Sequence, residues 1–111
     1  GGTVSWRVGA KGRIERSVDS GITWSRQKSG SSAELLAGSA PSAAVCWIVG
    51  RQGTILRSTD GGGHWGKVAA PVTGDISGIA AEDAMHAVIF GEGGGKFVTS
   101  DGGATWVVRL K

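Results

Sequence analysis

The sequence has no tyrosine, a single cysteine (Cys46) and only two prolines among its 111 residues. One cysteine excludes an intramolecular disulfide and a cysteine-based zinc site. The two longest uncharged apolar segments, residues 43–50 and 84–91, are far shorter than the roughly 20 residues that cross a bilayer, so we expect no membrane span in this segment. A formal net charge of +3 is too small to mark a nucleic-acid-binding protein.

Glycine and tryptophan, in contrast, are abundant, with 21 and 5 copies. The glycines follow no Gly-X-Y period, which excludes collagen, and a hydrophobic content of 40% excludes a disordered chain. Aligning the sequence with itself at an offset of 41 residues brings three copies into register without gaps. The residues that recur at this spacing include Asp19, Asp60 and Asp101, Gly21, Gly62 and Gly103, and Trp24, Trp65 and Trp106. The chain is therefore a repeat protein.

Each copy divides into short segments rich in Val, Ile, Thr and Trp that are separated by Gly and Asp, a pattern typical of strands and turns. In the second copy the four segments are residues 34–40, 44–49, 54–58 and 64–69. Four strands in about 41 residues, repeated along the chain, predict the blade of a β-propeller. The expected fold class is all-β, with blades of four antiparallel strands, about 2.7 repeats of 41 residues, and an incomplete ring.

We expect a single β-propeller segment over residues 1–111, divided into a partial blade 1–32, a blade 33–73 and a blade 74–111. The chain enters at the second strand of its first blade, and propellers have about four to eight blades, so three blades cannot close a ring. We predict closure by oligomerisation, and head-to-tail pairing of two chains is the simplest arrangement. The rival explanation is that the natural chain is longer and supplies the missing parts.

An eight-residue motif, the Asp-box, links the third and fourth segments of each copy. Residues 17–24 fit the pattern S-x-D-x-G-x-T-W in full, residues 99–106 have Thr in place of the first Ser, and residues 58–65 have His64 in place of Thr. An Asp carboxylate can accept main-chain N–H groups of its own turn, and Gly adopts a positive φ without strain, so we interpret these residues as structural. The structural Asp-box residues are Ser17, Asp19, Gly21, Trp24, Ser58, Asp60, Gly62, Trp65, Thr99, Asp101, Gly103 and Trp106.

Ahead of the first two boxes the sequence follows the pattern W-x-V-G-x-x-G-x-I-x-R. Together with the boxes, this pattern resembles the sialidase-type (BNR) repeat of the photosystem II stability/assembly factor family, and the resemblance covers nearly the whole chain. It implies a bacterial propeller in an extracytoplasmic (periplasmic, lumenal or secreted) location, with its Asp-box hairpins away from catalytic sites. It also implies a non-enzymatic interaction or scaffold function.

Glycoside hydrolysis is the most specific enzymatic alternative, because sialidases contain Asp-boxes. Sialidases use a tyrosine nucleophile, and the chain has no tyrosine. No motif pairs the acids outside the boxes, which are Glu15, Glu34, Asp75, Glu82, Asp83 and Glu92. Cys46, His64 and His86 occupy positions of the repeat and have neither metal-ligand nor triad spacing. We therefore expect no enzyme: no catalytic residue, no metal site and no cofactor.

Binding is the better-supported class of function. In a propeller the turns between second and third strands open on the face opposite the Asp-box hairpins, and here they fall at residues 10–13, 51–53 and 92–94. Arg16 and Arg57 recur at one position of the third strand and could line a shared groove; alternatively, they shield a sheet edge or pair with acids. The candidate binding face consists of Lys11, Arg13, Arg16, Arg51 and Arg57.

A basic face of this kind suits acidic protein segments or anionic glycans. The aromatic residues that stack on bases are missing from these turns, so we expect no nucleic acid partner. The favoured function is a non-enzymatic interaction module that binds a protein partner and forms a homo-oligomer, with a dimer favoured. The alternatives are a glycan-binding, lectin-like domain or a non-catalytic segment of a sialidase-like protein.

Overall fold

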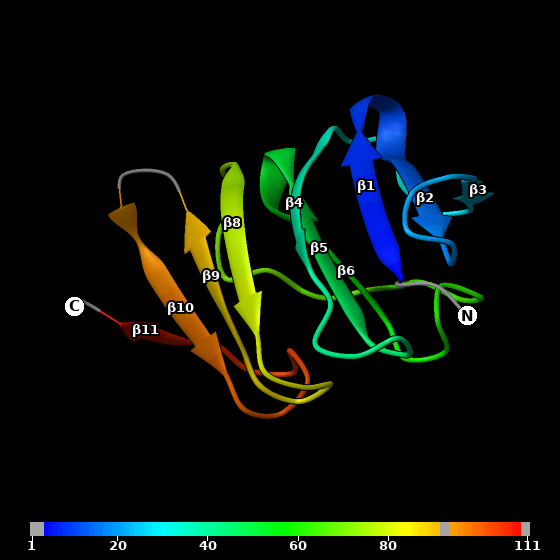
Figure 1. Ribbon diagram of the computed structural model, residues 1–111. Coiled ribbons are helices and arrows are strands. Elements are labelled where there is room, and N and C mark those ends of the chain that lie inside the picture. The colour runs from blue at the N-terminus through cyan, green and yellow to red at the C-terminus, as the bar shows by residue number, and fades with distance from the viewer. Residues whose placement is uncertain (1–3, 92–93, 110–111) are drawn as a thin grey trace.

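The computed structural model describes residues 4–91 and 94–109, and in these residues the chain is all-β, as predicted. Three antiparallel sheets follow one another side by side in sequence order, from the blue N-terminal sheet to the orange C-terminal one (Figure 1). No helix among the described residues is long and apolar enough to cross a membrane.

The strands occur in the order that the repeat predicts, and each pairs antiparallel with the next strand of its sheet. Sheet 1 contains β1 (Ser5–Gly9), β2 (Arg13–Ser17) and β3 (Ser25–Gln27). Sheet 2 contains β4 (Leu35–Ser39), β5 (Cys46–Gly50), β6 (Thr54–Ser58) and β7 (Gly66–Lys67). Sheet 3 contains β8 (Ile76–Ala81), β9 (Ala87–Gly91), β10 (Lys96–Thr99) and β11 (Val107–Arg109). Sheet 1 has three strands in the described residues, so β1 lies at its edge.

The outer strands β3, β7 and β11 are shorter than predicted, and each begins one residue after the repeated tryptophan. The turn extends this far because the main-chain N–H of Thr23 donates to the carboxylate of Asp19 (2.9 Å) and not to a neighbouring strand. The equivalent bond forms in the other two copies. The blade boundaries at residues 32 and 73 stay predictions.

Two short 3-10 turns, η1 (Ala10–Gly12) and η2 (Arg51–Gly53), join the second and third strand positions of sheets 1 and 2. Their middle residues, Lys11 and Gln52, have left-handed backbone angles, with φ of 59° and 60°. Few non-glycine residues adopt this conformation. The repeat therefore fixes the backbone of the turn and places Lys11 at the tip beside β1.

Sheet 2 supplies side chains to two hydrophobic cores, which explains why every residue of β5 is buried. An edge-to-face pair of tryptophans packs at each sheet interface: the ring centroids of Trp6 and Trp65 are 5.6 Å apart, and those of Trp47 and Trp106 are 6.3 Å apart. The core toward sheet 1 consists of Ile14, Leu35, Cys46, Ile48 and Leu56. The core toward sheet 3 consists of Trp47, Val49, Ile55, Ile76, Ala87 and Ile89.

Candidate functional site

The three Asp-boxes form the same hydrogen-bonded turn. In the first box the carboxylate of Asp19 accepts the N–H of Thr23 (2.9 Å), and the hydroxyl of Ser17 accepts the N–H of Gly21 (2.8 Å). The other two boxes repeat both bonds at 2.9 Å. A hydrogen bond from the side chain four residues later is the main reason that the pKa of each aspartate falls to about 2; the pairs are Asp19–Thr23, Asp60–His64 and Asp101–Thr105. Each carboxylate is therefore engaged by its own turn.

The five basic residues of the candidate binding face lie in four different places. Lys11 and Arg13 lie together at the β1–β2 turn, and Arg51 lies at the equivalent turn of sheet 2. Arg16 and Arg57 lie at the other end of the third strand positions, next to the Asp-boxes. The structure thus groups two of the five, and a groove shared by Arg16 and Arg57 stays a prediction.

Arg51 is held by two ion pairs. Its guanidinium contacts Glu34 (Nε–Oε1, 2.7 Å) and Asp75 (Nη1–Oδ2, 2.8 Å) and so joins the segments that precede β4 and β8. The hydrogen bond to Glu34 is the main cause that raises the pKa of Arg51. The third predicted turn includes Glu92 and Gly93, which lie outside the described residues.

Arg57 and Arg16 both lie over the tryptophan of their own sheet. The guanidinium carbon of Arg57 is 5.5 Å from the ring centroid of Trp47, and that of Arg16 is 5.6 Å from the ring centroid of Trp6. Arg57 also reaches sheet 3, where its Nε donates to the carbonyl oxygen of Ala84 (2.8 Å). These two arginines therefore contribute to the packing between sheets.

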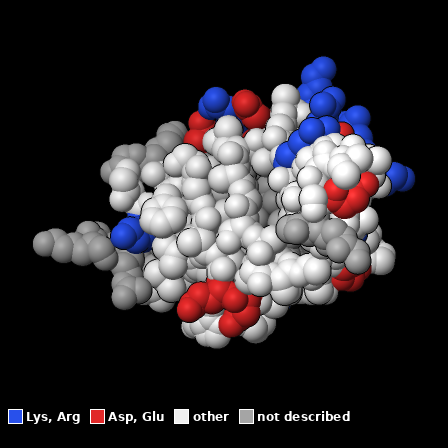
Figure 2. Space-filling view, viewed as in Figure 1, with Lys and Arg blue, Asp and Glu red and all other residues white. Residues whose placement is uncertain are grey.

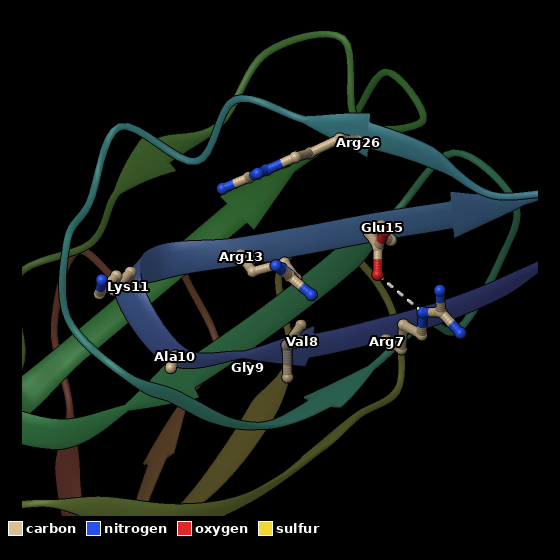
Figure 3. Close-up of a pocket in the computed structure, with 8 residues that line it drawn as sticks. All are labelled: Arg7, Val8, Gly9, Ala10, Lys11, Arg13, Glu15 and Arg26. Carbon is tan, nitrogen blue, oxygen red and sulfur yellow. Dashed lines mark hydrogen bonds and ion pairs between the residues drawn. The ribbon is translucent and has the colours of Figure 1, made fainter.

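A hollow of about 500 Å³ opens on the face of sheet 1 that is turned away from sheet 2 (Figure 3). Strand pairing explains its composition, because Arg7 lies opposite Glu15 on β2, and Glu15 lies opposite Arg26 on β3. Side chains at directly paired positions project from the same face of a sheet. We call this hollow the basic hollow; its charged lining residues are Arg7, Lys11, Arg13, Glu15 and Arg26.

The basic hollow has an excess of positive charge. Arg7 pairs with Glu15 (Nε–Oε1, 2.7 Å), and this hydrogen bond is the main cause that lowers the pKa of Glu15. In the part of the chain that the structure describes, Lys11, Arg13 and Arg26 have no ion-pair partner, and all three are exposed. Figure 2 shows Lys and Arg side chains gathered over sheet 1. Three cations without an ion pair on one concave surface favour anionic ligands.

Sequence reasoning from the turns finds Lys11 and Arg13 but misses Arg7 and Arg26, which lie within strands. A comparison at the 41-residue offset provides the missing signal, because charged residues replace apolar ones at matching positions. The matching pairs are Arg7 and Glu15 in sheet 1, Ile48 and Leu56 in sheet 2, and Ile89 and Phe97 in sheet 3. In sheets 2 and 3 this face packs against the preceding sheet, whereas in sheet 1 it carries the basic hollow.

Arg7, which stands where sheets 2 and 3 have an isoleucine, also changes the surroundings of Trp24, the tryptophan of the first Asp-box. Trp65 and Trp106 pack on a tryptophan of the preceding sheet, but Trp24 is covered by the guanidinium of Arg7, which lies 4.2 Å from its ring centroid. Arg7 thus contacts both Trp24 and Glu15. It is therefore the lining residue of the basic hollow that is held by both an ion pair and an aromatic ring.

Comparison with known proteins identifies relatives of the whole chain. The family described as photosynthesis system II assembly factor YCF48 matches residues 2–111. The solved structure "YCF48 bound to D1 peptide" has a TM-score of 0.84 and 25% identity, and the match covers 95% of this chain and 36% of that one. YCF48 from Cyanidioschyzon merolae has a TM-score of 0.84 and 27% identity, with 96% and 33% covered. The chain thus spans about a third of the length of these structures. No curated protein matches it.

Proposed function

The chain belongs to the photosynthesis system II assembly factor YCF48 family, and on this premise we propose that it is a non-enzymatic module that binds an extended segment of a protein partner. The similar structure of YCF48 bound to D1 peptide has a peptide as its ligand, which supports a ligand of the same class for this chain. The observation that carries the proposal is the basic hollow of sheet 1, with three cations that lack an ion pair among the described residues.

The chemistry of the basic hollow favours a segment rich in carboxylates. Guanidinium groups bind carboxylates through two parallel hydrogen bonds, and Lys11 adds an ammonium at the rim beside Arg13 and Arg26. All of these groups are exposed, so attraction between charges determines the association rate and the specificity for the partner. Because salt screens exposed charges, binding weakens as the salt concentration rises.

The basic hollow does not contain the pair of carboxyl groups that a hydrolytic mechanism would use among its described lining residues. Glu15 is its one carboxylate among the described lining residues, and its pairing with Arg7 keeps it ionised. Glycoside hydrolysis by the usual route needs two carboxyl groups on either side of the scissile bond. This composition supports the non-enzymatic assignment.

A binding measurement tests the proposal. The probe is a fluorescent octapeptide of alternating Glu and Ala, compared by anisotropy with an octapeptide of alternating Gln and Ala. We expect the Glu peptide to bind, the Gln peptide to bind at least about tenfold more weakly, and the difference to shrink as salt rises. The variant Arg13→Gln with Arg26→Gln should lose most of the affinity for the Glu peptide.

The matched control is Lys67→Gln with Lys96→Gln, which removes the same charge from sheets 2 and 3. Equal loss in both double variants would show that net charge, and not the basic hollow, attracts the peptide. Anionic glycans are the other ligand class that a basic surface accepts, so a sulfated oligosaccharide is measured as well. Tight binding of that glycan without binding of the Glu peptide would contradict the proposal.

A further inference from the structure

Met85, the single methionine of the chain, lies on the loop between β8 and β9 and is 45% exposed. The equivalent residue of sheet 2 is Ala44, which is exposed although sheet 2 has a neighbouring sheet on each side (Figure 1). The exposure therefore belongs to this position of the repeat and does not depend on what lies beyond sheet 3. A flexible thioether that reaches solvent is open to oxidation.

The Met85 side chain lies against the guanidinium of Arg57, which comes from β6 of sheet 2. Nη2 of Arg57 donates to Sδ of Met85 at 3.7 Å, and this hydrogen bond is weak because sulfur is a poor acceptor. Nε of the same guanidinium donates to the carbonyl oxygen of Ala84, the residue before Met85 (2.8 Å). Arg57 is therefore fixed beside the sulfur, with one N–H group directed at it.

The third Asp-box lies against both side chains. The main-chain N–H of Gly102 donates to the carbonyl oxygen of Met85 (3.0 Å), which joins the turn of the box to the β8–β9 loop. A Cβ added at Gly102 would lie 3.3 Å from Sδ of Met85 and 3.4 Å from Nη2 of Arg57. The thioether thus lies between solvent on one side and a cation held at the junction of sheets 2 and 3 on the other.

We propose that Met85 is an oxidation site whose sulfoxide binds Arg57 and strengthens the packing of sheet 2 against sheet 3. In the reaction with hydrogen peroxide, a lone pair of Sδ forms the S–O bond and the O–O bond breaks. The departing hydroxide takes the proton of the transferred OH group and leaves as water, so the sulfur is oxidised and the peroxide is reduced. The sulfoxide oxygen is a strong acceptor, and the weak N–H···S contact becomes a charge-assisted N–H···O hydrogen bond.

The surroundings of the two sulfur atoms of the chain favour this site. Met85 is not among the residues of the two hydrophobic cores, so its oxidation does not place an oxygen among buried apolar side chains. Cys46 is 1% exposed, and burial raises the pKa of its thiol to about 12, so little of it is reactive thiolate. Peroxide should therefore modify Met85 before Cys46.

Treatment of the purified chain with hydrogen peroxide tests the proposal. Peptide mapping by mass spectrometry should place one added oxygen on Met85, at a rate within about tenfold of that of the tripeptide Gly-Met-Gly. The equilibrium constant for unfolding, measured in urea, should then fall about tenfold, because a hydrogen bond from a charged donor replaces a weak contact. Met85→Leu should show no added oxygen at this position and no change in the urea midpoint.

Two arginine variants separate the contact with Arg57 from oxidation itself. In Arg57→Ala the sulfoxide has lost its donor, so oxidation should not raise the urea midpoint. Arg16→Ala is the matched control, because Arg16 occupies the equivalent position of sheet 1 and lies over Trp6; this variant should keep the full rise. NMR of the native chain gives a readout that needs no variant: the guanidinium N–H signals of Arg57 should shift and exchange more slowly with water after oxidation.

Oxidation of Met85 more than about tenfold slower than that of the tripeptide would overturn the oxidation site. A urea midpoint of the native chain that stays constant or falls on oxidation, or that rises equally in Arg57→Ala, would overturn the strengthened packing. Guanidinium signals of Arg57 that do not respond to oxidation would overturn the hydrogen bond to the sulfoxide.

Discussion

The guanidinium of Arg57 donates a hydrogen bond to the main-chain carbonyl of Ala84, with Nε and O 2.8 Å apart, and this contact joins sheet 2 to sheet 3. Arg16 occupies the equivalent position of sheet 1, but its Nε is buried and has no hydrogen-bond partner among the described residues. Two arginines at one repeat position therefore contribute differently to the packing of neighbouring sheets.

The tryptophan side chains at the two sheet interfaces also differ in whether their N–H groups are hydrogen-bonded. Nε1 of Trp47 and Nε1 of Trp106 donate to main-chain carbonyls across the interface between sheets 2 and 3, at 3.1 and 3.0 Å. Nε1 of Trp6 and Nε1 of Trp65, at the interface between sheets 1 and 2, are buried without a partner in the residues that the structure describes. Buried donors without a partner cost free energy, so the first interface is the weaker of the two.

Arg57→Ala should therefore destabilise the chain more than Arg16→Ala. The first change removes a hydrogen bond from a charged donor and a contact with Trp47, which together contribute about 2 kcal/mol to the free energy of unfolding. The second removes the equivalent contact with Trp6 but no hydrogen bond of Nε among the described residues, so it should cost less, about 1 kcal/mol. Urea unfolding followed by tryptophan fluorescence measures both. A larger loss for Arg16→Ala would contradict this ranking.

Gly50→Ala should destabilise the chain strongly, whereas Gly9→Ala should not. The new Cβ at position 50 would lie 2.2 Å from the carbonyl oxygen of Glu34, so β4 or β5 must move, at a cost of about 1–3 kcal/mol. The Cβ at position 9 meets nothing, and the loss of glycine entropy in the unfolded chain adds about 0.5 kcal/mol of stability. Thermal melts of the two variants compare them directly, and equal melting temperatures would refute the prediction.

The Asp-boxes should make the chain less stable in acid. The pKa of Asp101 is about 2 in the folded state against an ordinary value of 3.8, chiefly because the hydroxyl of Thr105 donates to its carboxylate. A lowered pKa means that the ionised form favours folding, so this contribution is complete above pH 3.8 and is lost as the pH falls toward about 2. Asp101→Asn should lower the urea midpoint at neutral pH and flatten its decline over this range.

Glu82→Gln is the matched control for Asp101→Asn, because it removes one exposed carboxylate outside the Asp-boxes. This variant should keep the full decline of the urea midpoint in acid. If the two variants and the native chain lose stability in parallel between pH 3.8 and about 2, the Asp-box hydrogen bonds do not cause the acid sensitivity.

The charged face of sheet 1 should limit self-association. A head-to-tail dimer, as predicted from the repeat, would pack the Arg7–Glu15 pair against the apolar face of sheet 3, where Phe90 and Val107 are 36% and 66% exposed. Removing an ion pair from water costs more than its attraction returns unless new hydrogen bonds form. Arg7→Ile with Glu15→Leu restores the residue pair of sheet 2, so sedimentation equilibrium should give a dissociation constant about tenfold lower than for the native chain. A tight native dimer that this variant weakens would contradict the prediction.

The repeat allows the fold to be predicted from the sequence, because Gly, Asp and Trp at a fixed spacing determine where strands end and turns begin. The family resemblance drawn from the same residues is confirmed by the match over residues 2–111. The site is harder to predict. Arg7 and Arg26 belong to different strands and come together only because both flank Glu15 in the paired sheet. The partner of Arg57, the carbonyl of Ala84, lies 27 residues away in the chain and carries no side-chain signal.

If sheet 1 is the peptide-binding part of the chain, NMR titration with the Glu–Ala octapeptide should show it residue by residue. We expect main-chain amide signals of β1 and of Lys11, Arg13 and Arg26 to shift with one common dissociation constant, while those of the three Asp-box turns stay in place. Shifts confined to the Asp-box turns or to sheet 3, with those of sheet 1 unmoved, would contradict it.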